Sequence, residues 1–371
     1  MKIYFDENMP FATEFFASFG ELIPFAGRNL TSAQLTDADV LLVRSITQVN
    51  AELISTAKRL KFVGTATIGV DHVDQAYLQQ RNIAFSAAPG CNAISVAEYV
   101  LSALVVMSER LQRELCSLTV GIVGAGNTGS RLAEKLDALG ICYKLCDPLL
   151  AANNQDVREF VELDEVLCCD VISLHVPLTQ HSLYTTYHLF NEQRLAQLTP
   201  EQLLINACRG EVVDNKALLA LKRAQQGPKL VLDVWENEPH ILTELLPYTD
   251  IATAHIAGYS LEGKARGTEQ HYQALCQVLA VPVSLHLAQF LPKAGIAQVM
   301  LNEHYNRVIR DKLITLVCDV RRDDAIFRQQ IQNQGFDYIR KTYPARREFS
   351  SLAITSVHEE TLNVLHQLGF C

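Results

Sequence analysis

The sequence predicts an α/β protein with two parallel sheets, followed by a smaller α+β domain. Two observations carry this prediction: short β-rich runs alternate with helical patterns in two successive series, and the pattern changes beyond about residue 282. Such alternation is typical of parallel strands joined by crossover helices. The length of 371 residues agrees with two or three domains of roughly 150 residues each.

The first series spans residues 1 to about 89. Its strand-like runs are IYF near the start, VLLVR at 40–44, LKFVG at 60–64 and IAFSA at 83–87. Helical patterns lie between them at 11–19 and 70–81. We therefore expect a parallel sheet covered by helices in this part of the chain.

A long helix-like segment at 95–111 leads into the second series, which contains six strand-like runs. They are TVGIVGAG, ICYKLCD, DVISLHV, QLLINA, KLVLDVW and DIATAHI. Six strands make a full doubly wound sheet. After Ser260, one more helix is expected to end before Pro282.

Residues 282–371 predict a separate small α+β domain. A helical stretch at 303–319 and the charged run VRRDDAIFRQQ come first, followed by the basic segment RKTYPARRE, the strand-like FSSLAITSV and a final helix. Apolar runs mixed with Arg and Asp clusters suit an interface with a polar rim. We expect this domain to form a homodimer interface; a monomeric appendage is the alternative.

The composition excludes several classes of protein. Lys and Arg total 32 against 41 Asp and Glu, a net charge of −9, and 49% of the residues are hydrophobic. This balance excludes a disordered chain and gives little attraction for nucleic acid or anionic lipid. The longest apolar stretch, 96–107, contains Glu98 and is too short to span a bilayer, and the opening KIYFDE does not resemble a signal peptide. We expect a soluble, cytoplasmic protein that does not bind a membrane.

The ten cysteines lie mostly in apolar runs, and no pair has the spacing of a zinc ribbon. We expect reduced thiols in or near the core and no metal centre. Cys208 stands out because Arg209 follows it.

A glycine-rich segment, Gly124-x-Gly126-x-x-Gly129, follows the apolar run TVGIV and opens a helical pattern. The next strand-like run ends in Asp147, close to the spacing of the acid that binds an adenosine ribose. This context predicts a dinucleotide-binding Rossmann domain; a tight turn followed by an unrelated acid is the alternative. A carboxylate at Asp147 would repel a 2′-phosphate, and Pro148 follows it instead of Arg, so NAD is favoured over NADP.

Three chemically suitable residues each follow a predicted strand of the second sheet: Arg209, Glu238 and His255. Open α/β sheets place their sites at these carboxyl ends. His255 suits a general base for a hydroxyl proton, Glu238 could orient the imidazole, and Arg209 could bind a carboxylate bidentately. Taken singly, each has an ordinary structural alternative: a surface ion pair, a turn residue or a core histidine.

These motifs together resemble the D-isomer-specific 2-hydroxyacid dehydrogenases over residues 1–280. The segments are VGIVGAGNTGSRLA, HVPLT, INACRGEVVDNKAL, LDVWENEP and HIAGYSLEGKARG. The resemblance implies an NAD-dependent dehydrogenase in which Arg209, Glu238 and His255 are catalytic. It also implies a flavodoxin-like substrate (lid) domain at 1–92 plus 257–281, a Rossmann NAD domain at 93–256 and a C-terminal dimerisation domain at 282–371.

The same resemblance implies a set of cofactor-binding residues around the glycine-rich turn and the strand ends. They are Gly124, Gly126, Asn127, Gly129, Asp147, Val176, Asn206, Ala207, Cys208, Asp233 and Gly258.

Further segments narrow the resemblance to one branch of this family. They are DENMPFA, VRSIT, FVGTATIGVDHVD, SAAPGCNAISVAEYV, VCDVRRDDAIFR and RREFSSL. The branch implies oxidation of a small phosphorylated hydroxy acid, 4-phospho-D-erythronate, at C2 to 2-oxo-3-hydroxy-4-phosphobutanoate in pyridoxal 5′-phosphate (vitamin B6) biosynthesis. It implies Ser45, Thr67 and Tyr259 as substrate contacts and a homodimer.

Other interpretations remain open. A 3-phosphoglycerate dehydrogenase is the nearest alternative within the class, and a non-catalytic NAD-binding regulator of the same fold lies outside it. The residues that hold the phosphate are also open, with Arg44, Lys264, Arg266, Arg346 and Arg347 as candidates. For Arg346 and Arg347, a solvated surface is the favoured interpretation.

Overall fold

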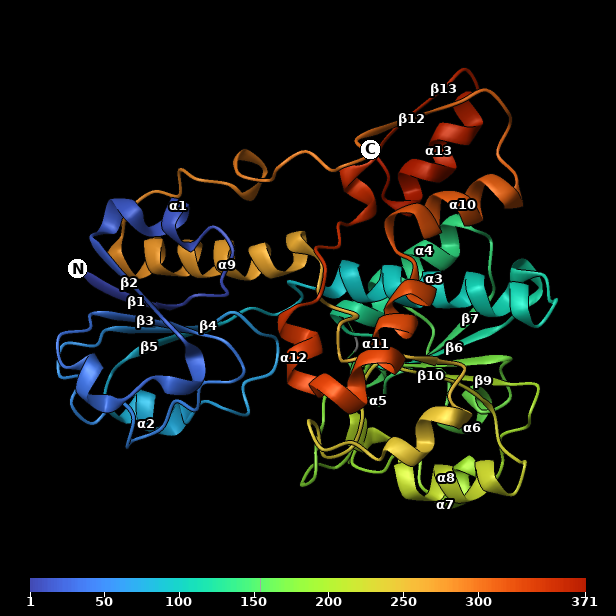
Figure 1. The fold of residues 1–371 in the computed structure, drawn as a ribbon, viewed down its shortest axis with the longest axis horizontal. Helices are drawn as coiled ribbons and strands as arrows, with labels where there is room; N and C mark the ends of the chain where they lie inside the picture. Colours follow the sequence, from blue (N-terminus) through green and yellow to red (C-terminus); the bar gives the residue numbers. More distant parts are fainter. Residues whose placement is uncertain (154) are drawn as a thin grey trace. The chain divides into compact units, whose positions relative to one another are not determined.

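The computed structural model describes residues 1–153 and 155–371. The chain forms two compact units: Met1–Asn92 with Leu261–Lys293, and Ala93–Ser260 with Ala294–Cys371. Each unit contains one large parallel sheet (Figure 1). Among the described residues, no helix has both the length and the apolar character that a bilayer crossing would need.

The first unit has a five-stranded parallel sheet in the order β2-β1-β3-β4-β5. Its strands are β1 (Lys2–Asp6), β2 (Glu21–Phe25), β3 (Val40–Val43), β4 (Phe62–Thr65) and β5 (Ala84–Ala87). Its helices are α1 (Ala12–Phe16), α2 (Gln75–Gln80) and α9 (Leu261–Leu279). This strand order is that of the flavodoxin-like fold, as the sequence predicts.

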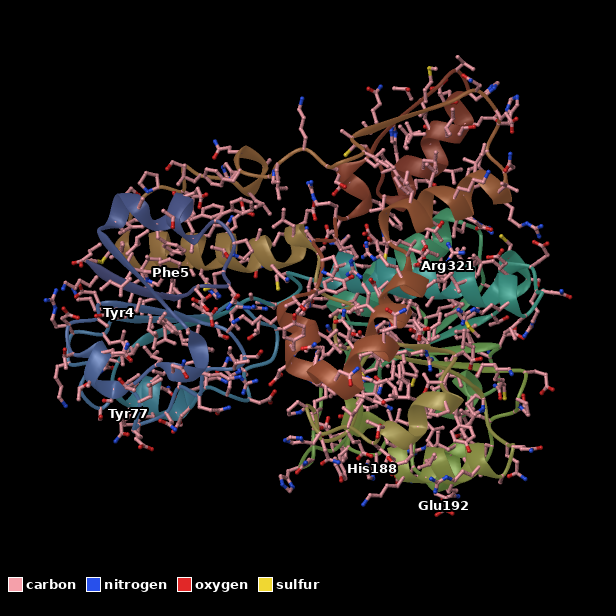
Figure 2. The ribbon with its side chains drawn as sticks, viewed as in Figure 1. Tyr4, Phe5, Tyr77, His188, Glu192 and Arg321 are labelled. Carbon is pink, nitrogen blue, oxygen red and sulfur yellow. The ribbon has the colours of Figure 1, made fainter. Side chains whose placement is uncertain are left out.

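Successive residues of β1 serve two different cores. Tyr4 packs in the cluster that includes Leu78 of α2, whereas Phe5 packs with Tyr272 of α9 (Figures 1 and 2). Side chains alternate between the faces of a strand, so helices on both faces require apolar residues at successive positions. Strand β3 shows the result, with all four residues buried.

The second unit has a six-stranded parallel sheet in the order β11-β10-β9-β8-β6-β7. Its strands are β6 (Val120–Val123), β7 (Tyr143–Cys146), β8 (Val171–Leu174), β9 (Leu203–Asn206), β10 (Lys229–Leu232) and β11 (Ile251–Ala252). Its helices before the tail are α3 (Ala93–Arg110), α4 (Asn127–Ala138), α5 (Pro148–Ala151), α6 (Leu163–Val166), α7 (Glu192–Leu195) and α8 (Asn215–Arg223). These six strands confirm the predicted doubly wound sheet, and the order reverses between β6 and β8.

The tail, residues 294–371, packs on this second unit. It contains α10 (Arg307–Val317), α11 (Val320–Gln334), α12 (Phe336–Lys341), α13 (Glu359–Leu368) and a parallel pair, β12 (Gln298–Leu301) and β13 (Ala353–Ser356). Its apolar residues enter both cores of the unit: Leu365 joins the cluster of α3 and α4, and Phe327 joins the cluster of Trp235. The tail therefore contributes to the hydrophobic core of the unit.

Short 3₁₀ turns complete the described structure: Ala17–Phe19, Gly27–Asn29, Ser32–Leu35, Leu115–Ser117, Gly210–Val212, Thr243–Tyr248, Leu287–Gln289 and Phe349–Ser351.

The sequence did not predict two strands, β2 and β12. Pro24 lies inside β2. A proline has no backbone N–H to donate, and it is tolerated here because β2 is an edge strand with no neighbouring strand on its outer side. The predicted helix at 70–81 is wrong in its first half, because Asp74 caps α2 through the Tyr77 backbone N–H and the helix begins at Gln75. The predicted three-domain boundaries stay a prediction.

Candidate active site

The glycine-rich turn lies where the strand order of the second sheet reverses, the usual ligand position in open α/β sheets. Gly124 has φ +92°, and a Cβ there would lie 2.6 Å from the His175 carbonyl oxygen. A Cβ on Gly129 would lie 2.1 Å from the Gly124 oxygen. Around Gly126 there is open space for a Cβ, so a ligand can approach the backbone.

These three glycines give a cradle of the kind that a pyrophosphate needs. Helix α4 begins at Asn127, directly after Gly126, so its N-terminal N–H groups lie at the open position. Val176 follows β8 and lines the other side, since its Cγ1 lies 2.9 Å from the Cβ position of Gly124. The residues present therefore fit a dinucleotide diphosphate.

Asp147 directly follows the next strand, β7, and is hydrogen-bonded to this turn. One carboxylate oxygen accepts the Ala125 N–H at 3.0 Å, and the other caps α5 through the Leu150 N–H at 3.1 Å. Arg158 was missed by the sequence reasoning: its Nη1 donates to the Ala125 oxygen and to Ser130 Oγ, both at 2.9 Å. Its charge is paired with Asp156, and this hydrogen-bonded ion pair lowers the pKa of Asp156 to about 2.

The loop after β9 holds Arg209 in an extended conformation. Asn206 fixes this loop, because its side chain donates to the Arg209 oxygen at 2.9 Å and accepts the Cys208 N–H at 3.2 Å. A Cβ on Gly210 would lie 2.0 Å from the Trp235 carbonyl, so the loops after β9 and β10 touch at backbone level. Ala207, between Asn206 and Cys208, is half-buried. Burial raises the pKa of the Cys208 thiol to about 11, which makes it an unreactive thiol at neutral pH.

Glu238 and His255 form a hydrogen-bonded pair at the carboxyl ends of β10 and β11. His255 Nδ1 lies 2.7 Å from Glu238 Oε2, and the other carboxylate oxygen accepts the Trp235 N–H at 2.9 Å. Burial alone would raise the pKa of Glu238, but attraction and hydrogen bonding from His255 outweigh it and lower the pKa. A carboxylate at Nδ1 fixes the imidazole so that Nε2 is available as a proton acceptor.

Asp233 holds residues on both sides of His255. Its buried carboxylate accepts the Thr253 hydroxyl at 2.6 Å, the Ile256 N–H at 2.8 Å and the Ala257 N–H at 2.9 Å. The main chain of His255 is held in a left-handed conformation, φ +56°, by this arrangement. Gly258 lies half-buried in the turn that follows, one residue beyond the second of these N–H donors.

The predicted substrate contacts belong to different units. Ser45 follows β3 and is exposed, and Thr67 follows β4, its hydroxyl donating to the Gly69 oxygen at 2.9 Å. Because β3 and β4 are paired parallel strands, Ser45 and Thr67 lie at the same edge of the first sheet. Tyr259 belongs to the second unit, and the Arg340 guanidinium lies over its ring at 5.3 Å.

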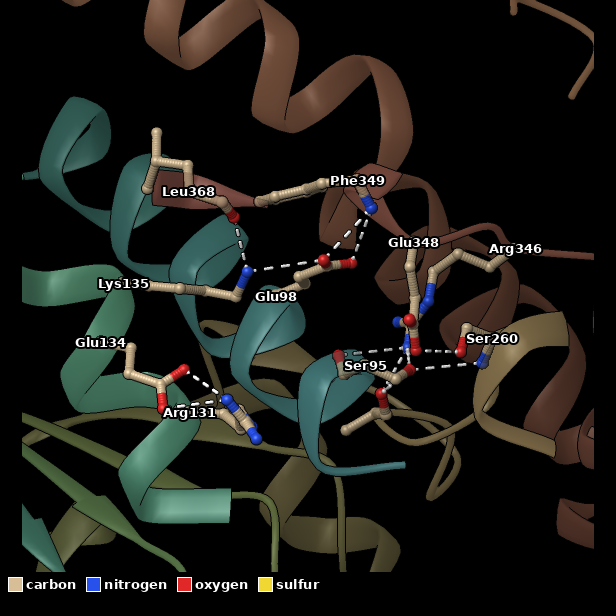
Figure 3. Close-up of polar contacts among 11 residues, drawn as sticks. Ser95, Glu98, Arg131, Glu134, Lys135, Ser260, Arg346, Glu348, Phe349 and Leu368 are labelled. Atoms are coloured by element: carbon tan, nitrogen blue, oxygen red, sulfur yellow. Dashed lines mark hydrogen bonds and ion pairs between the residues drawn. The ribbon is translucent and has the colours of Figure 1, made fainter. Parts of the chain in front are cut away.

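Arg346 does not lie on a solvated surface, so that expectation is wrong. It is 2% exposed, and its guanidinium donates to Ser95 Oγ and the Ala257 oxygen (Figure 3). Nearby, Ser260 Oγ donates to Glu348 at 2.8 Å. The tail thus binds residues that lie just inside two of the three points at which the chain passes between units, 92/93 and 260/261.

A second buried polar contact joins the tail to α3 and α4. Lys135 Nζ lies 3.5 Å from Glu98 and donates to the Leu368 oxygen at 2.7 Å (Figure 3). Glu98 also accepts the Phe349 N–H at 3.1 Å. Burial raises the pKa of the Glu98 carboxyl, and the attraction of Lys135 opposes that rise.

One group of side chains has the composition of a cation site: His188, labelled in Figure 2, with Asp214 and Glu236. Its atoms are already bonded to one another and to α8. Glu236 pairs with His188 Nε2 at 2.6 Å and accepts the Asn215 N–H at 2.7 Å, and Asp214 caps the helix. Helix capping explains the group, and we assign no metal to it.

Two family models match this chain. Residues 98–257 match the NAD binding domain of the D-isomer specific 2-hydroxyacid dehydrogenases. Residues 290–369, most of the tail, match a domain of unknown function.

Solved structures share the fold. The D-lactate dehydrogenase of Aquifex aeolicus, crystallised with NAD and lactic acid, is 27% identical with a TM-score of 0.60, covering 75% of this chain and 95% of that chain. The 3-phosphoglycerate dehydrogenase of Entamoeba histolytica, with bound NAD+, has a TM-score of 0.63 at 24% identity, covering 76% of this chain and 95% of that chain.

Full-length relatives are more similar. The erythronate-4-phosphate dehydrogenase of Colwellia psychrerythraea is 58% identical over 390 aligned positions, covering 100% of this chain and 99% of that protein. The protein of the same name from Tolumonas auensis is 54% identical, with the same coverage. Because this identity extends through the tail, the chain belongs to the erythronate-4-phosphate dehydrogenases, within the D-isomer-specific 2-hydroxyacid dehydrogenase family.

Proposed function

We propose that this chain oxidises 4-phospho-D-erythronate at C2 to 2-oxo-3-hydroxy-4-phosphobutanoate, as a step of pyridoxal 5′-phosphate (vitamin B6) biosynthesis. The observation that carries the proposal is identity of 58% with a relative of that activity over essentially its whole length. That relative matches the whole of this chain, whereas the 3-phosphoglycerate dehydrogenase neighbour matches 76% of it. This difference favours 4-phospho-D-erythronate over 3-phosphoglycerate as the substrate.

The cofactor is NAD, as the matched family model and the NAD-bound structural neighbour indicate. Gly124, Gly126, Gly129 and the start of α4 would hold its diphosphate, and Asp147 its adenosine ribose. Bound NAD supplies the acceptor for the hydride from C2.

The residues of this chain then supply proton transfer and orientation. His255 accepts the proton of the C2 hydroxyl at Nε2, and Glu238 stabilises the resulting imidazolium through the 2.7 Å contact at Nδ1. Arg209 binds the substrate carboxylate and polarises the C2 oxygen. We include Ser45, Thr67 and Tyr259 as substrate contacts. A regulator without catalysis would need the cofactor cradle but not the Glu238–His255 pair.

The assay measures NADH formation by the purified full chain with 4-phospho-D-erythronate, 3-phosphoglycerate and D-lactate. His255→Gln should lower kcat by about 10² to 10⁴, the usual contribution of general acid–base catalysis. His240→Gln, which changes an exposed histidine nearby, is the matched control. Turnover of 3-phosphoglycerate but not the four-carbon acid would refute the substrate, and near-normal turnover by His255→Gln would refute the assigned base.

We also propose that the tail is a dimerisation domain and that two copies associate through it. Several of its large apolar side chains are exposed, among them Met300 at 71% and Val357 at 82%. Both lie at the two-stranded sheet of β12 and β13, whose outer edges have no further strand among the described residues. A two-stranded sheet is marginal alone, and an open edge pairs readily with another copy.

Light scattering on the full chain tests this proposal. Met300→Asp should shift the protein toward the monomer, whereas Leu183→Asp, at an 88% exposed residue outside the tail, should leave the dimer unchanged. A monomeric wild type at micromolar concentration would contradict it. We propose the cytoplasm as the compartment, because all ten cysteines are free and six of them are buried.

A further inference from the structure

The tail helix α12 brings a cation to the second unit's site. The guanidinium carbon of Arg340 lies 5.3 Å from the ring centre of Tyr259 and 6.0 Å from that of Phe336. Two aromatic faces at these distances hold a guanidinium without neutralising it. Tyr259 is only four residues beyond His255, and the attraction of Arg340 contributes to the lowered pKa of Glu238.

The hydrogen-bonding capacity of Arg340 is incompletely used. Its Nε is buried and has no hydrogen-bond partner among the described residues. Burying an N–H of a charged group without an acceptor is energetically unfavourable, so we expect a bound ligand to supply the acceptor. Arg346 offers a contrast, because its guanidinium already donates to Ser95 and the Ala257 oxygen.

We propose that Arg340 is a substrate-binding residue whose guanidinium donates to the phosphate of the phosphorylated hydroxy acid. This inference rests on the proposed function and deepens it. The substrate carries two anionic groups, and Arg209 is assigned to the carboxylate. The phosphate needs a second cation, and a planar guanidinium whose buried Nε has no partner among the described residues matches its oxygens. Arg340 supplies that group beside the Glu238–His255 pair.

The test compares two substrates that differ only in the phosphate. The full chain, Arg340→Gln and the control Lys341→Gln are assayed with 4-phospho-D-erythronate and with D-erythronate. Lys341 is the exposed neighbour of Arg340 on α12, so its variant removes the same charge from the same helix. Arg340→Gln should lower kcat/KM for the phosphorylated acid roughly 10- to 100-fold, mainly through KM, and change kcat/KM for D-erythronate less than threefold.

Inorganic phosphate provides a second readout. It should inhibit the wild type and Lys341→Gln in competition with the phosphorylated acid, and inhibit Arg340→Gln at least tenfold more weakly. Arg340→Lys keeps the positive charge and should recover part of the preference for the phosphorylated acid over D-erythronate. It replaces Arg340→Gln in both assays if Arg340→Gln does not fold.

The outcomes separate this inference from the proposed function. An equal fall of kcat/KM for both substrates would overturn it, because packing on Tyr259 or attraction to Glu238 does not depend on a phosphate. The inference would also be overturned if Arg340→Gln kept the wild-type ratio of kcat/KM for 4-phospho-D-erythronate to kcat/KM for D-erythronate. A wild type that does not oxidise 4-phospho-D-erythronate would refute the proposed function itself, and that result comes from the wild type alone.

Discussion

Replacing Arg346 by methionine should destabilise the second unit strongly. Methionine keeps much of the buried stem and removes the guanidinium, which donates to Ser95 Oγ and to the Ala257 oxygen. Both acceptors are buried, and Ala257 lies two residues beyond His255. The substitution therefore removes two charge-assisted hydrogen bonds from a region that water does not reach, and leaves the Ala257 oxygen with the Ser95 hydroxyl and Ser95 Oγ with the Ser260 N–H as their remaining donors.

The expected loss is about 3 to 5 kcal/mol. Two hydrogen bonds from a charged donor are each worth roughly 1.5 to 3 kcal/mol, and removing one member of a buried charged network typically costs about 3 to 5 kcal/mol. By contrast, Arg321 pairs with Asp319 on the surface, and its guanidinium-bearing side chain is 46% exposed. Arg321→Met should cost less than about 1 kcal/mol.

Urea unfolding followed by tryptophan fluorescence measures this difference. The chain has a single tryptophan, Trp235, which is buried in the second unit and packs on Phe327 of the tail at 5.8 Å. Its emission therefore reports the unit that the substitution affects. Similar unfolding midpoints for Arg346→Met and Arg321→Met would refute the structural role assigned to Arg346.

Three further predictions concern the cofactor cradle and the response to pH. Asp147→Ala should weaken NAD binding and narrow its margin over NADP, because a ribose hydrogen bond and a like-charge barrier are lost; equal affinities in calorimetry would contradict the assignment. Gly129→Ala should lower both stability and NAD affinity, since its Cβ would lie 2.1 Å from the Gly124 oxygen, and an unchanged melting temperature would argue against that contact. Burial lowers the pKa of His175 and His271 to about 4. The unfolded chain then binds more protons than the folded chain between about pH 6.5 and pH 4, so the free energy of unfolding should decrease as pH falls through that window; a flat profile from denaturant titrations would exclude this linkage.

Much of the fold follows from local patterns in the sequence. Parallel strands buried on both faces give continuous apolar runs, and these runs predicted ten of the eleven strands of the two large sheets. Strand β2 was not predicted because Pro24 interrupts its run of strand-forming residues. This edge strand pairs with β1 alone. Tertiary pairing, which a local pattern does not report, decided this element.

The candidate site also contains residues that the sequence predicts and residues whose roles only the tertiary structure assigns. Glu238 and His255 could be paired in advance because the carboxyl ends of neighbouring parallel strands meet at one edge of a sheet. The basic segment RKTYPARRE gave no means of separating its arginines. Arg340 lies over an aromatic ring with a free donor, whereas Arg346, six residues later, is buried among acceptors from distant segments. Only the packing of the tail on α3 and on the loop after β11 assigns these different roles.

The attachment of the tail also bears on how this architecture can be recombined. A chimera that grafts residues 294–371 onto another dehydrogenase of the family would carry Arg346 and Glu348 without Ser95 and Ser260, their present partners. The recipient would have to supply matching acceptors and donors at the 92/93 and 260/261 crossings, or the graft would bury unpaired charge. Exchange of this segment between lineages therefore requires compensating changes in α3 and in the loop that leads into α9, so these three regions should vary together rather than separately.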